Sequence, residues 1–388
     1  MSSLFDRLRE RAVEIHIGDH LRARLQRGDS LRIKLGLDPT APDLHIGHLV
    51  VLDILRLFQD EGHTVVVIIG DYTALIGDPS GRSVTRPMLT EEEIDRNAET
   101  YFEQLDLVLD RSKIEVRHNS EWLATMSAAD ILRLMAKATL QQVLQREDFA
   151  DRMKAGTPIS AHEVLYPFNQ AYDSVAIKAD VEIGGTDQLF NLLFGREIQK
   201  AYGQESQDVA VFPLLEGTDG VQKMGKSLNN YIGLTEPPEE IYGKTMSIPD
   251  SLIEKYVGLV SGLTRDEQAR VLAKKPRDAK AALARQLVRR LHGDGAALGA
   301  EEDFDRRFRR REPVPVITFR NLDDVDARTV VEVMQVVGLA KSGNEARRLL
   351  SQRGVKVDGD VQTTDFTLSR GSHTIQVGKR PGVGVIIR

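Results

Sequence analysis

The first half of the chain alternates short apolar runs with longer amphipathic stretches. Aliphatic and basic residues alternate over 31–37, which predicts a strand with one buried face. Residues 49–58 have helical spacing, and residues 64–71 form a β-branched run typical of a buried parallel strand. Further strand-like runs, separated by helical stretches such as 128–145, occupy residues 114–117, 179–183 and 209–215. This order predicts an α/β fold with a Rossmann-like, doubly wound parallel sheet.

The pattern changes in the second half of the chain. Residues 239–311 lack strand-like runs and predict several helices, and Pro313 and Pro315 then interrupt the chain like a linker. We therefore expect an α/β domain over residues 1–235, an all-α domain over 236–312, a linker over 313–327 and a small α+β domain over 328–388.

The last of these segments has local signals of its own. Ser342, with Glu345 three residues later, predicts a capping box for a helix that ends at Gly354. The dipeptide Asp358-Gly359 predicts a hairpin between two short strands. The segment holds ten Lys/Arg and five Asp/Glu, a formal charge of +5 against −11 for the rest of the chain. Such a charge favours contact with a polyanion, although an excess of this size also arises by chance.

Composition bounds the class of protein. The 388 residues are 41% hydrophobic and 28% charged, as in a soluble globular protein. No apolar run approaches the ~20 residues that cross a bilayer, and the N-terminus lacks a signal-peptide core, so we expect no membrane contact. The sequence contains no cysteine, which excludes disulfides, thiol catalysis and cysteine-ligated zinc. We expect a cytoplasmic protein.

The segment DPTAPDLHIGHL at 38–49 lies between the first predicted strand and its helix. His45, Gly47 and His48 fall at the helix start, where free backbone N–H groups and the helix dipole favour an anion. The imidazoles can donate to phosphate oxygens. Two alternatives are a simple helix cap and a metal site, but no third ligand is evident and we predict no protein-held metal.

The segment GVQKMGKS at 220–227 matches the phosphate-binding P-loop letter for letter. A P-loop must run directly into a helix, whereas Ser227 is followed by loop-like residues, so we reject that interpretation. The segment is better interpreted as a mobile loop whose Lys223 and Lys226 can close over a triphosphate. Two exposed lysines on an ordinary loop are the alternative.

Taken together, these two segments resemble the class I aminoacyl-tRNA synthetases. In that family the histidines corresponding to His45 and His48 bind the ATP phosphates, and the lysines corresponding to Lys223 and Lys226 stabilise the departing pyrophosphate. Gly225 stands where the family usually has serine. That departure concerns the stiffness of the loop.

A third segment, YPFNQAYDSV at 166–175, spaces Tyr166, Gln170 and Asp173 by four and three, so a helix would present them on one face. Such a face is ordinarily solvated. Here GDPSG at 77–81 and GGTDQ at 184–188 also end predicted strands, which favours a shared pocket, although either could be a turn alone. The set resembles the bacterial-type tyrosyl-tRNA synthetases, from about residue 31 to 235.

This resemblance implies a tyrosine site. Asp78, Tyr166 and Gln170 would hold the substrate ammonium, Asp173 would accept the phenol hydrogen bond, and Gln188 would lie near the carboxylate. Gly36 and Asp38 would line the same cleft.

The resemblance also implies an ATP site beside it. Thr40 would join His45 at the terminal phosphates, and Gly185 and Asp187 would lie at the ribose. The rest of the expected ATP site is Gly47, His48, Lys226 and Ser227.

The tail resembles an S4-type RNA-binding domain. Arg347 and Arg348 on its capped helix, with Arg353 and Lys356 beyond, would face the RNA backbone, unless they only form a solvated surface. The resemblance further implies that residues 236–312 bind the anticodon. It also implies a homodimer formed through an insertion at about 100–178.

The implied reaction is ATP-dependent ligation of L-tyrosine to tRNA(Tyr) through tyrosyl-adenylate, with release of pyrophosphate. ATP is then a substrate, Mg²⁺ arrives bound to it, and no tightly bound cofactor is expected. A tryptophanyl enzyme is the nearest alternative, and Asp173 argues against it. An RNA-binding relative without activity is another, and the intact histidines and lysines argue against it. Many family members have tyrosine where this chain has Lys34, so the second phenol contact stays open.

Overall fold

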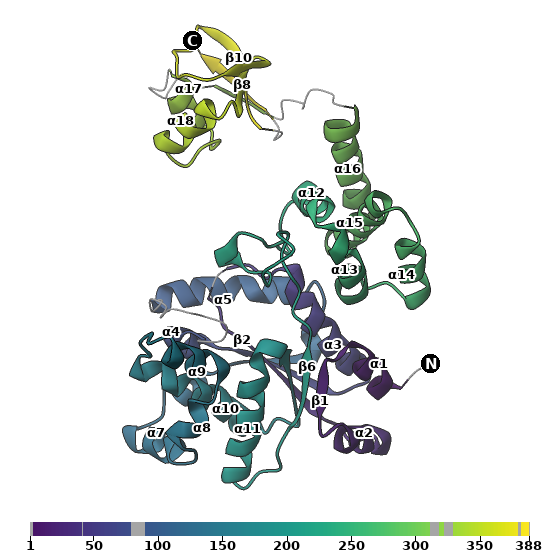
Figure 1. Cartoon of the computed structure of the whole chain (residues 1–388), viewed down its shortest axis with the longest axis vertical. Coiled ribbons are helices and arrows are strands. Elements are labelled where there is room, and N and C mark those ends of the chain that lie inside the picture. The colour runs from purple at the N-terminus through teal and green to yellow at the C-terminus, as the bar shows by residue number, and fades with distance from the viewer. Residues whose placement is uncertain are drawn as a thin grey trace. The chain divides into compact units, whose positions relative to one another are not determined.

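The computed structural model describes residues 3–40, 42–78, 90–310, 318–321, 329–378 and 382–387. It contains two compact units, Met1–Ala300 and Glu301–Arg388, which are taken in turn (Figure 1). Residues 79–81 of the GDPSG segment lie outside the described residues, as does most of the predicted linker. The described part of that linker, Thr318–Asn321, is strand β7, which the sequence analysis missed.

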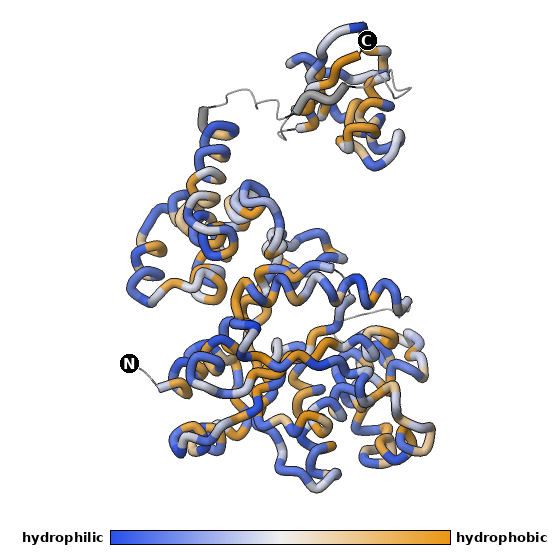
Figure 2. Tube along the Cα trace, turned by 180° about the vertical axis from the view of Figure 1, so that it is seen from behind, coloured by the Kyte–Doolittle hydropathy of each residue, from blue (hydrophilic) through white to orange (hydrophobic). Residues whose placement is uncertain are grey.

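A six-stranded sheet forms the centre of the first unit, in the order β1-β6-β5-β2-β3-β4. All neighbours are parallel except β1, which runs antiparallel to β6 at the edge. The strands are β1 (Glu14–His16), β2 (Arg32–Leu37), β3 (Thr64–Ile69), β4 (Ile114–His118), β5 (Val181–Gly185) and β6 (Asp208–Phe212). The predicted doubly wound sheet is confirmed, whereas three-residue β1 was too short to predict. Figure 2 shows hydrophobic residues concentrated on the central strands.

Helices follow the strands as predicted. They are α1 (Leu4–Arg11), α2 (Gly18–Arg27), α3 (Leu49–Asp60), α4 (Asp71–Ile76), α5 (Glu91–Leu105), α6 (Ser120–Leu123), α7 (Ala128–Met135), α8 (Leu140–Val143), α9 (Glu147–Lys154), α10 (Leu165–Ile177) and α11 (Leu189–Ala201). The single helical stretch expected over 128–145 was wrong, because Thr139 caps a new helix and so separates α7 from α8.

Strand β2 also corrects the sequence analysis, which gave it one buried face. Ile33 and Leu35 are buried on one side, but Lys34 on the other side is fully buried as well. Lys34 Nζ lies 2.9 Å from an oxygen of Glu182, its register partner on β5, and donates to Gln170 O and Ser174 Oγ on α10. Helices cover both faces of a parallel sheet, so the alternation of residue types does not mark a solvent side here.

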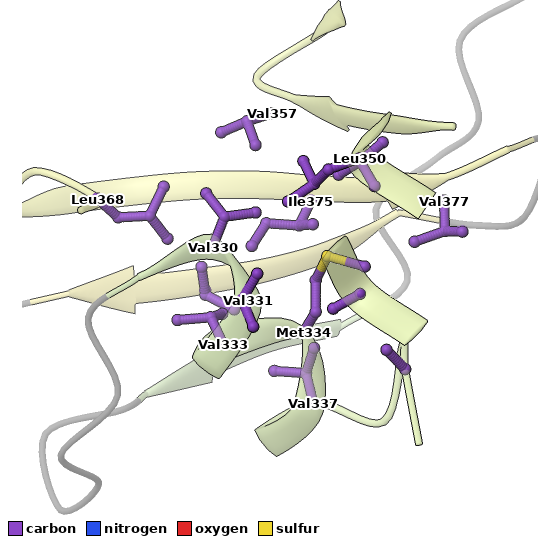
Figure 3. Close-up of a cluster of buried hydrophobic side chains, with 14 residues drawn as sticks. Val330, Val331, Val333, Met334, Val337, Leu350, Val357, Leu368, Ile375 and Val377 are labelled. Atoms are coloured by element: carbon purple, nitrogen blue, oxygen red, sulfur yellow. The ribbon is translucent and has the colours of Figure 1, made fainter. Parts of the chain in front are cut away.

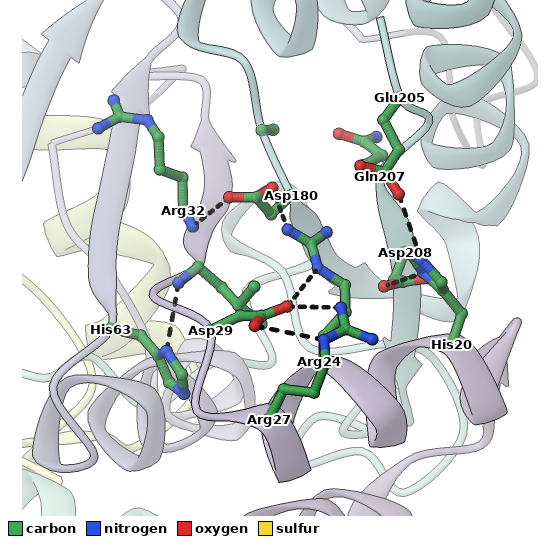
Figure 4. Close-up of polar contacts among 12 residues, drawn as sticks. His20, Arg24, Arg27, Asp29, Arg32, His63, Asp180, Glu205, Gln207 and Asp208 are labelled. Atoms are coloured by element: carbon green, nitrogen blue, oxygen red, sulfur yellow. Dashed lines mark hydrogen bonds and ion pairs between the residues drawn. The ribbon is translucent and has the colours of Figure 1, made fainter.

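The amino ends of the strands are joined by polar contacts (Figure 4). Asp180, just before β5, accepts from Arg32 N at 2.7 Å and from Arg24 on α2 at 2.6 Å. His20 Nδ1 lies 3.0 Å from Asp208, at the start of β6. These contacts tie α2 to the strand starts and leave the carboxyl ends of the strands for a site.

Five helices continue the chain, as the missing strand pattern predicted. They are α12 (Pro238–Ser247), α13 (Ile253–Val260), α14 (Arg265–Leu272), α15 (Pro276–His292) and α16 (Asp294–Asp305). Arg290 on α15 forms an ion pair with Asp53 on α3, and Tyr256 Oη donates to Glu216 O at 2.6 Å. Residues up to Ala300 therefore fold with the sheet as one unit.

The second unit combines α17 (Val330–Val336) and α18 (Gly343–Ser351) with a five-stranded sheet. Its strand order is β7-β11-β10-β8-β9, with β8 (Val355–Val357), β9 (Asp360–Gln362), β10 (Gly371–Val377) and β11 (Val383–Ile387). Figure 3 shows its core, in which Val333 and Met334 of α17 meet Ile375 of β10. The predicted α+β composition is confirmed in the described residues.

The local signals of this unit are mostly confirmed. Asp358 and Gly359 have φ of 53° and 93° and join β8 to β9, as the hairpin prediction required. Ser342 Oγ accepts from Glu345 N, but the Glu345 carboxylate accepts from Lys341 N, so the box is only half formed. The left-handed residue after α18 is Arg353, with φ of 59°, and not Gly354.

We expect Lys34→Met to destabilise the first unit strongly, because it leaves the buried Glu182 without its cation. Removing one partner of a buried ion pair costs about 3–5 kcal/mol. The double variant Lys34→Met/Glu182→Gln removes both charges and should recover most of the loss. Urea unfolding would measure both free energies, and a single variant as stable as the double would contradict the expectation.

Candidate active site

A cavity of about 980 Å³ opens at the carboxyl ends of the central strands. Every residue expected at the tyrosine and ATP sites lines it: Gly36, Asp38, Thr40, His45, Gly47, His48, Asp78, Tyr166, Gln170, Asp173, Gly185, Asp187, Gln188, Lys223, Lys226 and Ser227. The structure therefore brings these residues together, as expected for ligand binding at this end of an open α/β sheet. Their individual roles remain predictions.

One end of the cavity is acidic. Asp38 follows β2 and accepts from Tyr166 Oη and from Thr73 Oγ1, both at 2.8 Å. Desolvation is the largest cause that raises the pKa of Asp38 to about 7; the charge of the neighbouring Asp78 raises it as well, and the two hydrogen bonds lower it in part. A cation that enters the cavity would stabilise the ionised form of this carboxyl group.

Asp78 is held by groups from two later segments. Its carboxylate lies 3.0 Å from Arg146 Nη2 and accepts from Gln188 Nε2 at 2.8 Å. Arg146 is almost fully buried and also contacts Asp148 and Asn191. The sequence analysis missed Arg146, because it lies in the bend before α9, belongs to no motif and reaches Asp78 only through the tertiary fold.

Asp173 lies deeper, on α10, with 3% of its surface exposed. Trp122 Nε1 donates to one carboxylate oxygen at 2.8 Å, and Asn119 Nδ2 donates to the other at 3.3 Å. Burial raises the pKa of Asp173 to about 7, while the charge of Lys34 lowers it in part. Asn119 and Trp122 were also missed, although they follow the carboxyl end of β4, and that position was a usable signal.

His45 and His48 meet at the start of α3, and their ring centroids lie 4.1 Å apart. His48 Nδ1 lies 3.1 Å from His45 N and 3.2 Å from His45 O, and a neutral His48 carries one N–H. Burial lowers the pKa of His48 to about 4 and that of His45 well below its usual value. Both rings are therefore neutral donors at physiological pH.

The position between these histidines, Gly47, has no room for a side chain. A Cβ at this position would lie 2.9 Å from His45 Nδ1. Among the described residues, that buried nitrogen has no hydrogen-bond partner. The backbone here is therefore open to a ligand, beside a polar atom that a ligand can satisfy.

The lysine loop lines the same cavity as the histidines, and the charges of Lys226 and Lys223 help to lower the pKa of His45. Lys223 Nζ is 3.0 Å from Asp187, and Lys226 Nζ is 3.8 Å from Asp43 without a hydrogen bond within the described part of the chain. Burial lowers the pKa of Lys226. Only a 3₁₀ turn at Lys226–Leu228 follows, and Asn229 is left-handed with φ of 51°, so the rejection of a P-loop is confirmed.

Gly225 does not need to be glycine for its own conformation. Its φ of −166° and ψ of 145° are ordinary extended values, and an added Cβ would meet nothing closer than 3.9 Å. A serine would fit here.

The fold, the cavity and its two flanking motifs define a class I tRNA synthetase. A model of the family described as tRNA synthetases class I (W and Y) matches residues 26–309. The chain belongs to that family, and within it to the tyrosine–tRNA ligases, on the relatives that follow.

The tyrosine–tRNA ligase of Thermotoga maritima is 49% identical over 96% of this chain and 94% of its own length. That of Bordetella bronchiseptica is 48% identical over 96% and 92%. Among solved structures, tyrosyl-tRNA synthetase from Archaeoglobus fulgidus, complexed with L-tyrosine, superposes with a TM-score of 0.63 at 24% identity, over 77% of this chain and 99% of its own. Tryptophanyl-tRNA synthetase from Plasmodium falciparum gives 0.60 at 16%, over 78% and 85%. These two structures show the shared fold.

We expect Gly70→Ala to disrupt the acidic end of the cavity. The new Cβ would lie 2.0 Å from Asp38 Oδ1 and 2.4 Å from Thr73 Oγ1, so Asp38 must leave its hydrogen bonds. Such overpacking costs about 1–3 kcal/mol, measurable by thermal unfolding. Gly36→Ala is the matched control, because nothing lies within 4 Å of its added Cβ. Equal unfolding temperatures for the two variants would contradict this expectation.

Proposed function

We propose that this chain ligates L-tyrosine to tRNA(Tyr) with ATP, through tyrosyl-adenylate. One observation carries the proposal: a buried carboxylate suited to a phenol and a cationic loop suited to a triphosphate line the same cavity. Sequence identity of about half to tyrosine–tRNA ligases, over nearly the whole chain, supports the same reaction.

The tyrosine ammonium is assigned to the acidic end, at Asp78, Tyr166 and Gln170, with Asp38 behind Tyr166. Gln170 Oε1 is buried and lacks a hydrogen-bond partner in the described ranges, so an ammonium N–H can satisfy it. Gln188, already bonded to Asp78, is assigned to the substrate carboxylate.

Asp173 is assigned to the phenol. Trp122 and Asn119 each use one acceptor position on the carboxylate, and each oxygen keeps a second for the phenol O–H. Phenylalanine would bury the carboxylate without that partner, which disfavours it strongly. This contact does not require the tyrosine that many relatives carry at position 34.

The ATP phosphates are assigned to Thr40, Gly47 and the neutral N–H groups of His45 and His48. Gly185 and Asp187 are assigned to the ribose, and Ser227 to the phosphate end of the loop. Lys223 and Lys226 must then exchange their carboxylate partners for phosphate oxygens. Mg²⁺ would enter with ATP, because this ion binds largely through substrate phosphates.

In the first step, the tyrosine carboxylate attacks the α-phosphorus and the bond to pyrophosphate breaks. No protein nucleophile is needed, so the chain contributes position and charge. In the second step, a terminal hydroxyl of the tRNA attacks the tyrosyl carbonyl and AMP leaves.

The tRNA is assigned to the two later segments. We propose residues 236–312 for the anticodon and the domain at 328–388 for further contact with RNA. Arg347, Arg348, Arg353 and Lys356 are all exposed on α18, the turn after it and β8, as phosphate contacts require. Residues 1–235 would then carry the chemistry.

A homodimer is proposed through the insertion at about 100–178. Leu132, Leu140 and Met153 on α7, α8 and α9 are 68%, 56% and 56% exposed, although they are large and apolar. Burying such side chains against a second copy would remove them from water.

No described helix is long and apolar enough to span a bilayer.

Exchange of labelled pyrophosphate into ATP tests the proposal directly. We expect exchange that depends on tyrosine and is absent with tryptophan or phenylalanine. Asp173→Ala should abolish the preference for tyrosine over phenylalanine, since the acceptor is lost. Exchange driven by tryptophan, or by no amino acid, would refute the assignment.

Tyrosine affinity should depend on pH. The ammonium is favoured by an ionised Asp38 and the phenol O–H by an ionised Asp173, and both carboxyl groups have a pKa of about 7. The carboxylates are ionised above that pKa and lose their charge as pH falls, so binding should be about tenfold weaker at pH 6 than at pH 8 for one required ionisation. Trp122 is the chain's single tryptophan and contacts Asp173, so its fluorescence can report binding. Equal affinity across this range would contradict the expectation.

A further inference from the structure

The lysine loop is closed by one buried side chain, Asn230. Its neighbours Ser227, Leu228 and Asn229 are exposed, whereas Asn230 is only 3% exposed. It does not line the cavity. Its burial therefore needs an explanation other than direct contact with a ligand.

Both ends of the Asn230 amide bind the loop itself. Oδ1 accepts from Gly225 N at 2.8 Å, directly between the two lysines. Nδ2 donates to Asp219 Oδ2 at 2.7 Å and lies 3.3 Å from Lys223 O. The same Asp219 accepts from Val221 N at 2.9 Å through its other oxygen. The Asn230 side chain thus connects three points of the loop: Asp219, Lys223 and Gly225.

Gly217 leaves the space that the Asn230 amide occupies. A Cβ on Gly217 would lie 2.2 Å from Asn230 Cγ, so only glycine fits opposite it. The Asn230 backbone oxygen also accepts from Thr218 N at 2.8 Å. At the base of the loop, Lys255 Nζ donates to Glu216 at 2.8 Å. Backbone hydrogen bonds also join this base to the arm that carries Lys223, from Met224 N to Leu215 O and from Gly217 N to Gln222 O, both at 2.8 Å. Asn230 adds the side-chain contact that reaches Gly225, beyond this pairing.

We propose that Asn230 is the positioning residue of the lysine loop, and that it holds the backbone of Lys223 and Gly225 where the lysines can meet the departing pyrophosphate. The inference rests on the proposed function. Charged groups stabilise a transition state best when they are already in place, because ordering them during the reaction costs free energy. Asn230 supplies this order through hydrogen bonds to the loop backbone and not through the lysine side chains.

Asn230→Asp tests this role with a change of one functional group. It keeps the acceptor for Gly225 N but places an oxygen where Nδ2 met Asp219 and Lys223 O. We expect kcat of tyrosine-dependent exchange to fall roughly 10- to 100-fold, while the Kd for tyrosine stays within about twofold. Asn229→Asp is the matched control, because it adds the same charge one residue earlier at an exposed position and should keep near-normal kcat.

The reciprocal pair separates positioning from general damage. In Asp219→Asn/Asn230→Asp, the new amide at 219 can donate to the new carboxylate at 230, so part of the lost kcat should return. Asp219→Asn alone lies at an exposed position and should lose kcat mildly, which keeps the test valid if Asn230→Asp folds poorly. A double variant no better than Asn230→Asp would overturn the proposal.

Cleavage by trypsin at Lys223 and Lys226 reports on the loop without using activity. We expect faster cleavage in Asn230→Asp than in Asn229→Asp, and slower cleavage again in the reciprocal pair. Equal cleavage and equal kcat in the two single variants would overturn the role of Asn230. A wild-type chain without tyrosine-dependent exchange would instead overturn the proposed function, and the cleavage rates would still decide whether Asn230 orders the loop.

Discussion

The buried ion pair between Lys34 and Glu182 joins the sheet to the helix that carries the recognition residues. Lys34 Nζ also binds Gln170 O and Ser174 Oγ, so it fixes one turn of α10 against β2 and β5. Gln170 and Asp173 lie on that turn and face the cavity. A charge buried this deeply is stable only when its partners are all in place. The position of Gln170 and Asp173 in the cavity therefore depends on this contact.

Carboxylates, lysines and histidines line the same cavity. Asp38 and Asp173 have raised pKa values, and each of the two loop lysines lies beside a carboxylate. The histidines stay neutral, because burial and the nearby lysine charge disfavour a second cationic centre. A neutral imidazole can donate a hydrogen bond to a phosphate, and it does not repel the lysines of the loop. A ligand that carries an ammonium at one end and phosphates at the other matches this distribution.

Local signals in the sequence identified most of the fold and much of the cavity. The hairpin at Asp358-Gly359 and the helix after His48 depend on residues close in sequence, so they could be predicted. Lys34 could not, because its burial is decided by α10, more than a hundred residues later. Arg146 likewise meets Asp78 only in the folded chain. The spacing of apolar residues could not predict the division of residues 128–145 into α7 and α8 either, because it does not show that Thr139 caps a new helix.

The glycine at position 225 illustrates how a departure from a family pattern can leave a mechanism intact. Its backbone is extended, and its own side chain, if present, would contact almost nothing. Glycine without a conformational need adds backbone freedom, which would loosen the loop between the two lysines. The hydrogen bond from Gly225 N to Asn230 opposes that freedom at the same residue. A serine would restrict the backbone at this position. Here the Asn230 amide restricts it instead, from the other side of the loop. The sequence pattern alone does not connect that amide to the lysines.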